Sequence, residues 1–199
     1  MPSPVAHSLA GLAVAHLALR SGSNPQSGRE RVFWTGALIV AANAADFDFL
    51  PGLLIGDVNA FHHKATHTLI AAVVFGLAAG GMAAFSRVKG ARRMGWIMGA
   101  SYLTHLLLDY LTRGTREPYG MRLMWPFSQA RFLAPFHLFL DIRRDSGAIA
   151  FLPSLVQMHN ARAVFIEVMV IVVAWGIYRT ISWLKWGFNG VGPRGSTQQ

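Results

Sequence analysis

The segment Gly95–Leu111 (GWIMGASYLTHLLLDYL) decides how the chain is interpreted, because it is a helix-length apolar run that carries two ionisable side chains. A histidine and an aspartate four residues apart lie one above the other on a helix, so His105 and Asp109 can reach one cation or one proton. Ser101 and Thr112 extend this polar stripe. Ionisable groups in an apolar helix need a partner. The segment therefore predicts a functional site, with a structural hydrogen bond between helices as the alternative.

Composition favours a membrane protein. Hydrophobic residues make up 53% of the 199 residues and charged residues only 14%, and the mean hydropathy is +0.36. The formal charge of +9 does not indicate nucleic-acid binding, because most basic residues flank the apolar blocks, where they meet lipid headgroups or set topology. We expect membrane lipids as partners and no nucleic acid.

The apolar blocks predict an all-α, polytopic membrane helix bundle of about four to five hydrophobic helices. These blocks are Ser3–Leu19, Phe33–Leu50, Thr66–Phe85, Gly95–Leu111 and Ala163–Leu184. Residues 113–162 are broken by prolines and rich in arginine, which is typical of an interfacial amphipathic region. We expect one membrane-embedded domain over residues 1–186 and a disordered tail over 187–199. The first block lacks a basic leader and is expected to stay in the mature chain.

Successive membrane spans alternate in direction, and this places the ionisable residues of the first four blocks at one membrane face. The residues concerned are His7, Asp46, Asp48, His62, His67, His105 and Asp109. His16 is the exception. The basic loops 20–31 and 87–93 fall on the opposite side, which the positive-inside rule makes cytoplasmic. The site is therefore expected to be extracytoplasmic.

Imidazoles and carboxylates without any cysteine suit a divalent metal held by nitrogen and oxygen ligands. Zinc is the favoured ion, with manganese or iron as alternatives. Such an ion lowers the pKa of a bound water and polarises a phosphoryl oxygen, as phosphoester hydrolysis requires. Asp48 and Asp109 are the catalytic candidates: one is expected to act as general base, and either can instead orient a histidine ligand.

Short motifs in a fixed order resemble the YdjM family of inner-membrane proteins, which are described as metal-dependent hydrolases. The motifs are Ala6–Leu9 (AHSL), Ala45–Asp48 (ADFD), His62–Thr68 (HHKATHT), Thr104–Asp109 (THLLLD), and Tyr119-Gly120 before Trp125–Ser128 (WPFS). The resemblance covers residues 6–128. More distantly, the same motifs resemble the zinc-dependent phospholipase C and single-strand nuclease superfamily. It implies a bacterial inner (plasma) membrane location and a site of one to three ions.

The chain departs from the family pattern at three positions. Ala45 stands where the family has proline, His63 where it has arginine, and Lys64 where it has glycine. The loop around His62 is therefore expected to differ in shape from that of the family. His63 is either an added ligand or a surface substitution.

Substrate contacts are expected from Arg113 and Arg116, just past the fourth block, where they can bind a phosphate or anchor to headgroups. The remaining histidines, His16, His137 and His159, are interpreted as packing residues, and Glu167 as interfacial. Because the site would open where headgroups lie, the favoured substrate is a phosphoester in a lipid or lipid-linked molecule. The alternatives are a non-catalytic membrane protein and an ion transporter with a His/Asp metal site.

Overall fold

The computed structural model describes residues 1–20, 27–114 and 119–189, and it is predominantly helical. The long helices are α1 (Pro4–Arg20), α2 (Gly28–Asn43), α4 (Leu69–Phe85), α5 (Ala91–Tyr110) and α7 (Met158–Asn189). The short elements are a 3₁₀ helix η1 (Ala44–Asp48), α3 (Phe49–Leu54), α6 (Ala148–Leu155), and the parallel strands β1 (Thr112–Arg113) and β2 (Phe139–Leu140), in which Thr112 pairs with Phe139.

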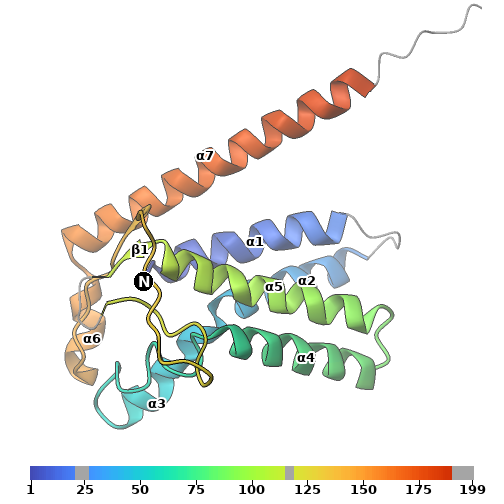
Figure 1. Cartoon of the computed structure of the whole chain (residues 1–199). Helices are drawn as coiled ribbons and strands as arrows, with labels where there is room; N and C mark the ends of the chain where they lie inside the picture. The colour runs from blue at the N-terminus through green and yellow to red at the C-terminus, as the bar shows by residue number, and fades with distance from the viewer. Residues whose placement is uncertain (21–26, 115–118, 190–199) are drawn as a thin grey trace, which may run out of the picture.

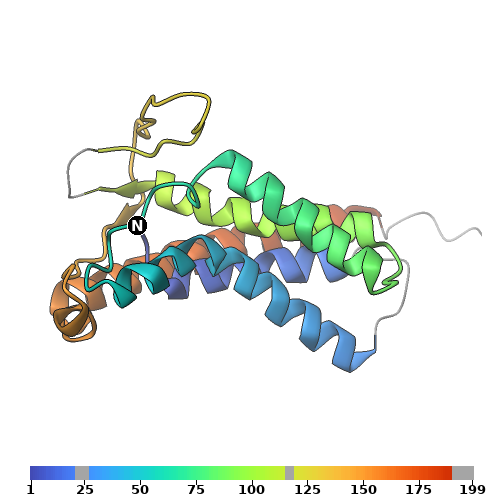
Figure 2. The same ribbon diagram turned by 90° about the horizontal axis from the view of Figure 1, so that it is seen from below.

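Four helices form a bundle in which α5 packs against α1, α2 and α4 (Figure 1). Helix α7 contacts the start of this bundle and then diverges from it (Figure 1). The turned view shows the loops and short elements gathered at one end of the long helices (Figure 2). Chain direction alternates between successive long helices, so the start of α1, the end of α2, the start of α4 and the end of α5 lie at one end.

Glycines let α4 and α5 approach closely. A Cβ atom on Gly95 would lie 2.7 Å from the carbonyl oxygen of Gly76 and 2.9 Å from the Cα of Gly80, and Gly99 faces Gly76 as well. Small residues spaced four apart on both helices allow backbone contact between membrane helices. This packing holds the end of α5 beside the segment that precedes α4.

Helix α5 is also joined to α2 by side-chain hydrogen bonds to the backbone. Ser101 Oγ donates to the Leu38 carbonyl at 2.7 Å, and His105 Nδ1 donates to the Ala42 carbonyl at 2.9 Å. The start of α2 is fixed by a capping box between Ser27 and Glu30. These contacts determine the rotation of α5 and therefore where its polar stripe points.

The second apolar block is one α-helix only as far as Asn43. The Asn43 amide donates to Ser8 Oγ and to the Ile39 carbonyl, and the chain continues as η1 and the short α3. The tighter 3₁₀ winding changes the direction of the side chains that follow. Asp46 and Asp48 are thereby presented to the bundle end.

Two helical stretches, Gly28–Leu54 and Met158–Leu184, are long and apolar enough to cross a membrane, and Leu69–Phe85 is a shorter apolar helix. Most apolar side chains along α7 are exposed, among them Val172, Ile177 and Trp183. These features support a membrane location. The expected number of four to five membrane helices stays a prediction. Of the expected tail, residues 187–189 continue α7, and residues 190–199 lie outside the described residues.

Candidate metal centre

The structure brings together all seven residues that the sequence analysis assigned to the site. His7 comes from the first turn of α1, Asp46 and Asp48 from η1, His62 and His67 from the connection between α3 and α4, and His105 and Asp109 from the last two turns of α5. The connection ends at Thr68, whose hydroxyl accepts a hydrogen bond from Ala71 N and caps α4. His67 therefore precedes the helix and is not part of it.

Four side-chain atoms form the centre of the cluster. The Nε2 atoms of His67 and His105 lie 3.3 Å apart. Each lies 3.5 Å from Asp46 Oδ1 and 3.4 Å from Asp109 Oδ2. Ligands at zinc bond lengths in a tetrahedron are separated by roughly 3.3–3.6 Å. The spacing of these atoms is therefore that of ligands around one ion, and it is too long for ordinary hydrogen bonds.

Hydrogen bonds to the outer ring nitrogens determine which nitrogen faces the centre. His105 Nδ1 donates to the Ala42 carbonyl. His67 Nδ1 lies 3.2 Å from Asp48 Oδ2 and 3.0 Å from Thr66 Oγ1. A ligating histidine commonly donates its other N–H to a carboxylate or carbonyl in this way. In both rings, Nε2 is left with its lone pair directed inward.

Asp48 holds two histidines at once. Its Oδ1 lies 3.0 Å from His62 Nδ1, and its Oδ2 accepts a hydrogen bond of 2.7 Å from the Thr66 hydroxyl in addition to the His67 contact. His62 Nε2 is buried and has no hydrogen-bond partner. Asp48 and Asp46 together with His62 form one of the groups with metal-ligand spacing. Both oxygens of Asp48 are thus engaged by the protein itself.

His7 extends the cluster on the far side of His105. The two rings stack with centroids 3.8 Å apart, and His7 Nε2 lies 3.6 Å from Asp109 Oδ1. His7 is fully buried, and neither of its ring nitrogens has a hydrogen-bond partner. Asp109 therefore faces His7 with one oxygen and the His67–His105 pair with the other, as a carboxylate that bridges two ions would.

His63 belongs to the same cluster, although its role was left open by the sequence. Its Nε2 lies 3.6 Å from Asp109 Oδ2, and His62, His63 and His67 form a further group with metal-ligand spacing. His63 has a φ of 57°, in the left-handed region that side chains other than glycine rarely occupy. Strained backbone of this kind concentrates at functional sites. The adjacent histidine was the signal in the sequence, but only the loop conformation shows where the ring lies.

Residues 62–67, which we call the histidine loop, have electrostatics that favour metal ligation. Burial lowers the pKa of His62 to about 3 and lowers the pKa of His63. Neutral imidazoles are the form that binds metals. Burial also acts to lower the pKa of His67, but its contacts with Asp46 and Asp48 outweigh this effect and leave that pKa raised. A cation bound between these carboxylates would take the place of the proton.

The donor set leaves many buried polar atoms without a partner inside the protein. Among the described residues, the buried side-chain atoms without a hydrogen-bond partner include both oxygens of Asp46, both oxygens of Asp109, both nitrogens of His7, and Nε2 of His62 and His63. Buried polar atoms are normally satisfied, and a buried charge without a partner is costly. All these atoms lie in one cluster of nitrogen and oxygen donors. The residues therefore fit a site for one or more divalent cations.

A cavity of about 350 Å³ opens on this cluster. His62, His63 and Asp109 line it together with four basic residues, Lys64, Arg122, Arg131 and Arg144. The rest of the lining is uncharged except for Asp141, which is paired with the amino group of Met1. We call this space the cationic cavity. Because Asp109, His62 and His63 are among its lining residues, the cavity lies directly beside the cluster.

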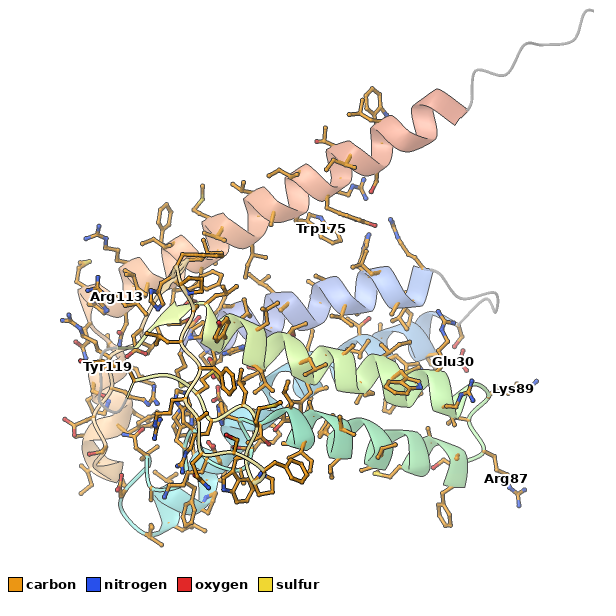
Figure 3. The ribbon with its side chains drawn as sticks, in the orientation of Figure 1. Glu30, Arg87, Lys89, Arg113, Tyr119 and Trp175 are labelled. Carbon is orange, nitrogen blue, oxygen red and sulfur yellow. The ribbon has the colours of Figure 1, made fainter. Side chains whose placement is uncertain are left out.

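The remaining candidates lie elsewhere. Arg113 lines a separate pocket with His137, and Arg116 lies outside the described residues. His16 contacts Trp175 of α7 edge to face, at a centroid distance of 4.6 Å, and Trp175 points from α7 toward α1 (Figure 3). The structure gives Arg113 no place in the cationic cavity. The basic residues of that cavity were not assigned to the site from the sequence; Lys64 and Arg122 lie within or beside the motifs, and Arg131 and Arg144 lie beyond them.

Glu167 is buried and belongs to a structural contact. Its carboxylate accepts hydrogen bonds from Ser3 N at 2.9 Å and from the Ser3 hydroxyl, which joins α7 to the residue before α1. His159 Nε2 contacts the Asp141 carbonyl at 3.0 Å. Neither residue lies in the metal-ligand groups.

Comparison with known proteins adds one finding. The model of the family described as YdjM inner membrane protein matches residues 1–186, which is nearly the whole chain. Among curated proteins and solved structures, nothing matches.

Proposed function

The chain belongs to the YdjM inner membrane protein family, and we propose that it is a membrane-bound, metal-dependent hydrolase. The proposal rests on one observation: donor atoms from α1, η1, the histidine loop and α5 converge at ligand spacing, and the oxygens of Asp46 and Asp109 and the nitrogens of His7 have no hydrogen-bond partner among the described residues. Such convergence needs four chain segments to cooperate, so a structural role for a single pair does not explain it. The substrate that we propose is a phosphoester of a lipid or lipid-linked molecule.

His67, His105, Asp46 and Asp109 would hold the first cation. His7 with the second oxygen of Asp109, and His62 with Asp46, would hold further ions, giving one to three in total. Nitrogen and oxygen donors suit zinc and tolerate manganese or iron. A bound cation of this kind supplies an activated water and polarises a phosphoryl oxygen.

The two aspartates that the sequence suggested as catalytic would have different roles. Asp109 lines the cationic cavity and is placed to orient the attacking water or accept its proton. Asp48 is committed to the outer nitrogens of His62 and His67, so we assign it the positioning of those two rings. Fixed rings keep the ligand atoms in place during the reaction.

We propose that the site faces the extracytoplasmic side. Arg87, Lys89 and Glu30 lie at the end of the bundle opposite the site (Figure 3), and basic loops favour the cytoplasm. This assignment can be checked by labelling introduced cysteines at residues 63 and 89 from outside intact cells, since the chain has no cysteine of its own.

The test is a hydrolysis assay on detergent-purified protein that has been stripped with a chelator and reloaded with zinc, manganese or iron. Phospholipids and other lipid phosphoesters serve as substrates. Activity should return with one of the ions in the wild type and in His16→Ala, whose ring lies away from the cluster, and should be absent from His67→Ala and His105→Ala. Activity in both site variants equal to that of wild type would refute the proposal.

The transporter alternative predicts a different result. Ion-coupling groups of transporters lie near the membrane midplane, whereas these donors gather at one end of the bundle. Flux of divalent metal into proteoliposomes, lost in His105→Ala and without any hydrolysis, would favour transport. A stable metal without flux or hydrolysis would favour the non-catalytic alternative.

A further inference from the structure

The cationic cavity contains basic groups that the metal cluster does not use. Lys64 follows His63 directly, and Arg122 and Arg131 come from the loop region after β1. Arg131 donates to the Gly120 carbonyl at 3.0 Å, and Arg144 donates to Asn59 Oδ1 at 3.1 Å and lies over the ring of Phe49. These contacts hold the two arginine side chains in the cavity wall.

Lys64 and Arg122 are the two basic residues of the cavity that best fit the binding of an anion. Among the residues that the structure describes, no ion pair is formed by either side chain. Arg122 donates to the neutral Gln129 at 3.1 Å, while its Nε is buried and has no partner. A buried guanidinium N–H without an acceptor is costly. An anion beside Asp109 and His63 would satisfy it.

A second cavity adjoins the first at these same two residues. It has a volume of about 650 Å³ and is lined by Lys64 and Arg122 on one side and mainly by apolar groups elsewhere, including Phe47, Phe61 and Trp125. We call it the apolar cavity. Phe127, two residues after Trp125, is 85% exposed, as a side chain that enters lipid would be.

Since two cavities of different character meet at Lys64 and Arg122, we propose that the substrate is an amphiphilic phosphoester bound across both. Its phosphate lies against Lys64 and Arg122 in the cationic cavity, next to Asp109, and its hydrocarbon chain lies in the apolar cavity. The inference rests on the proposed hydrolase function and adds where the phosphate and the hydrocarbon chain of the substrate bind and which residues bind them. Both volumes are in the range of small-molecule sites.

The reaction at this position is balanced as an ordinary hydrolysis. The oxygen of water forms a bond to phosphorus, the ester P–O bond breaks, and the leaving oxygen takes up a proton. For a monoester the products are inorganic phosphate and an alcohol that keeps the hydrocarbon chain. Lys64 and Arg122 would neutralise the phosphoryl oxygens, since a guanidinium binds phosphate in a bidentate manner and an ammonium binds it as a point charge.

Binding can be measured without hydrolysis by using phosphonates, whose P–C bond is not cleaved. Dodecylphosphonate and methylphosphonate are titrated by calorimetry into metal-loaded protein in maltoside micelles. Dodecanol, which has the hydrocarbon chain without the phosphonate group, is the control ligand. Lys64→Gln and Arg122→Gln should each weaken dodecylphosphonate binding by about tenfold or more, and Lys89→Gln at the other end should have no effect. Ala65→Phe, which narrows the apolar cavity, should weaken dodecylphosphonate and leave methylphosphonate unchanged.

Metal content is measured on the same samples, so that the two proposals fail separately. Equal affinity of all variants, or equal affinity for long-chain and short-chain phosphonates, would overturn the substrate assignment even if metal-dependent hydrolysis is observed. Loss of binding in Lys64→Gln and Arg122→Gln with full metal content and no hydrolysis of any phosphoester would support the binding site and refute the hydrolase. Binding that is lost only together with the metal would overturn the role of the two basic residues.

Discussion

Two buried carboxylates lie in apolar helices of this protein, and their surroundings differ completely. Glu167 in α7 accepts two hydrogen bonds from Ser3. Asp109 in α5 accepts no hydrogen bond from any residue that the structure describes, and imidazole nitrogens surround it at 3.4–3.6 Å. A satisfied carboxylate joins helices, whereas an unsatisfied one facing several imidazoles indicates a cation. The atoms that surround a buried carboxylate, and not its burial alone, therefore distinguish a structural residue from a candidate metal ligand.

The same contrast holds for a repeated motif. His105 and Asp109 have the spacing His-x-x-x-Asp, and so do His137 and Asp141. The first pair lies in the cluster. In the second pair, Asp141 contacts the amino group of Met1 at 2.6 Å, and His137 lines the pocket with Arg113. Spacing alone does not distinguish the two pairs, but the helix in which the first pair lies does.

The largest effect is expected from Asp109→Asn. Asparagine keeps the shape but removes the charge that faces two groups of histidines, so the cation loses a ligand shared by both. Stripped wild-type protein should gain thermal stability when zinc is added, because a ligand that binds only the folded state stabilises it. The variant should show no zinc-dependent shift in Tm. A full shift in Asp109→Asn would show that Asp109 is not a ligand.

A smaller effect is expected from Asp48→Asn. The amide can still contact one ring, but it no longer accepts from His62, His67 and Thr66 together. Loss of such an orienting group typically lowers metal affinity by about 10–100-fold. Competition with a chromophoric chelator measures this affinity, and complete loss of binding would instead place Asp48 among the direct ligands.

Thr66→Val should have a weaker effect of the same kind. It removes the hydroxyl that donates to Asp48 at 2.7 Å and lies 3.0 Å from His67 Nδ1, and it leaves the contacts of Asp48 with His62 and His67 in place. We expect metal affinity to fall by less than in Asp48→Asn, in the same chelator competition. A larger loss of metal affinity in Thr66→Val than in Asp48→Asn would contradict the assignment of Asp48 as the group that orients the two histidines.

Glu167→Ala should leave metal affinity unchanged and lower stability. The Ser3 N–H and hydroxyl lose their acceptor in a buried position, which costs about 1–3 kcal/mol of unfolding free energy. Thermal unfolding and zinc titration are measured together, with Glu167→Gln as the milder control. If Glu167→Ala loses metal at temperatures where it is folded, Glu167 is not a purely structural residue and the contrast with Asp109 is wrong.

Much of the site could be predicted because alternating helices place chain ends together. His7, Asp46, His67 and Asp109 each stand at the end of a block that faces the same side, and no detailed geometry is needed for that inference. The close packing of α4 and α5 was equally open to prediction, since Gly76, Gly80, Gly95 and Gly99 have the small-residue spacing.

Other features depended on loops, whose conformation the sequence does not determine. The left-handed backbone of His63 brings its ring to Asp109, and no periodicity indicates such a turn. Arg113 was chosen for its place just after α5, but β1 pairs with β2 there and its side chain lines another pocket. Arg122 and Arg131, which follow β1, and Arg144, which follows β2, line the same cavity as His62 and Asp109, and nothing in their spacing along the chain indicates this.

The central claim is that four chain segments build one metal centre, and metal content tests it most directly. Protein without a histidine tag is purified without chelators, and zinc, manganese and iron are measured by mass spectrometry for wild type, Asp109→Asn and Glu167→Gln. The account predicts at least one ion per chain in wild type and in Glu167→Gln, and a substantial loss in Asp109→Asn. Wild-type protein without a stoichiometric metal, or the same content in Asp109→Asn as in wild type, would contradict it.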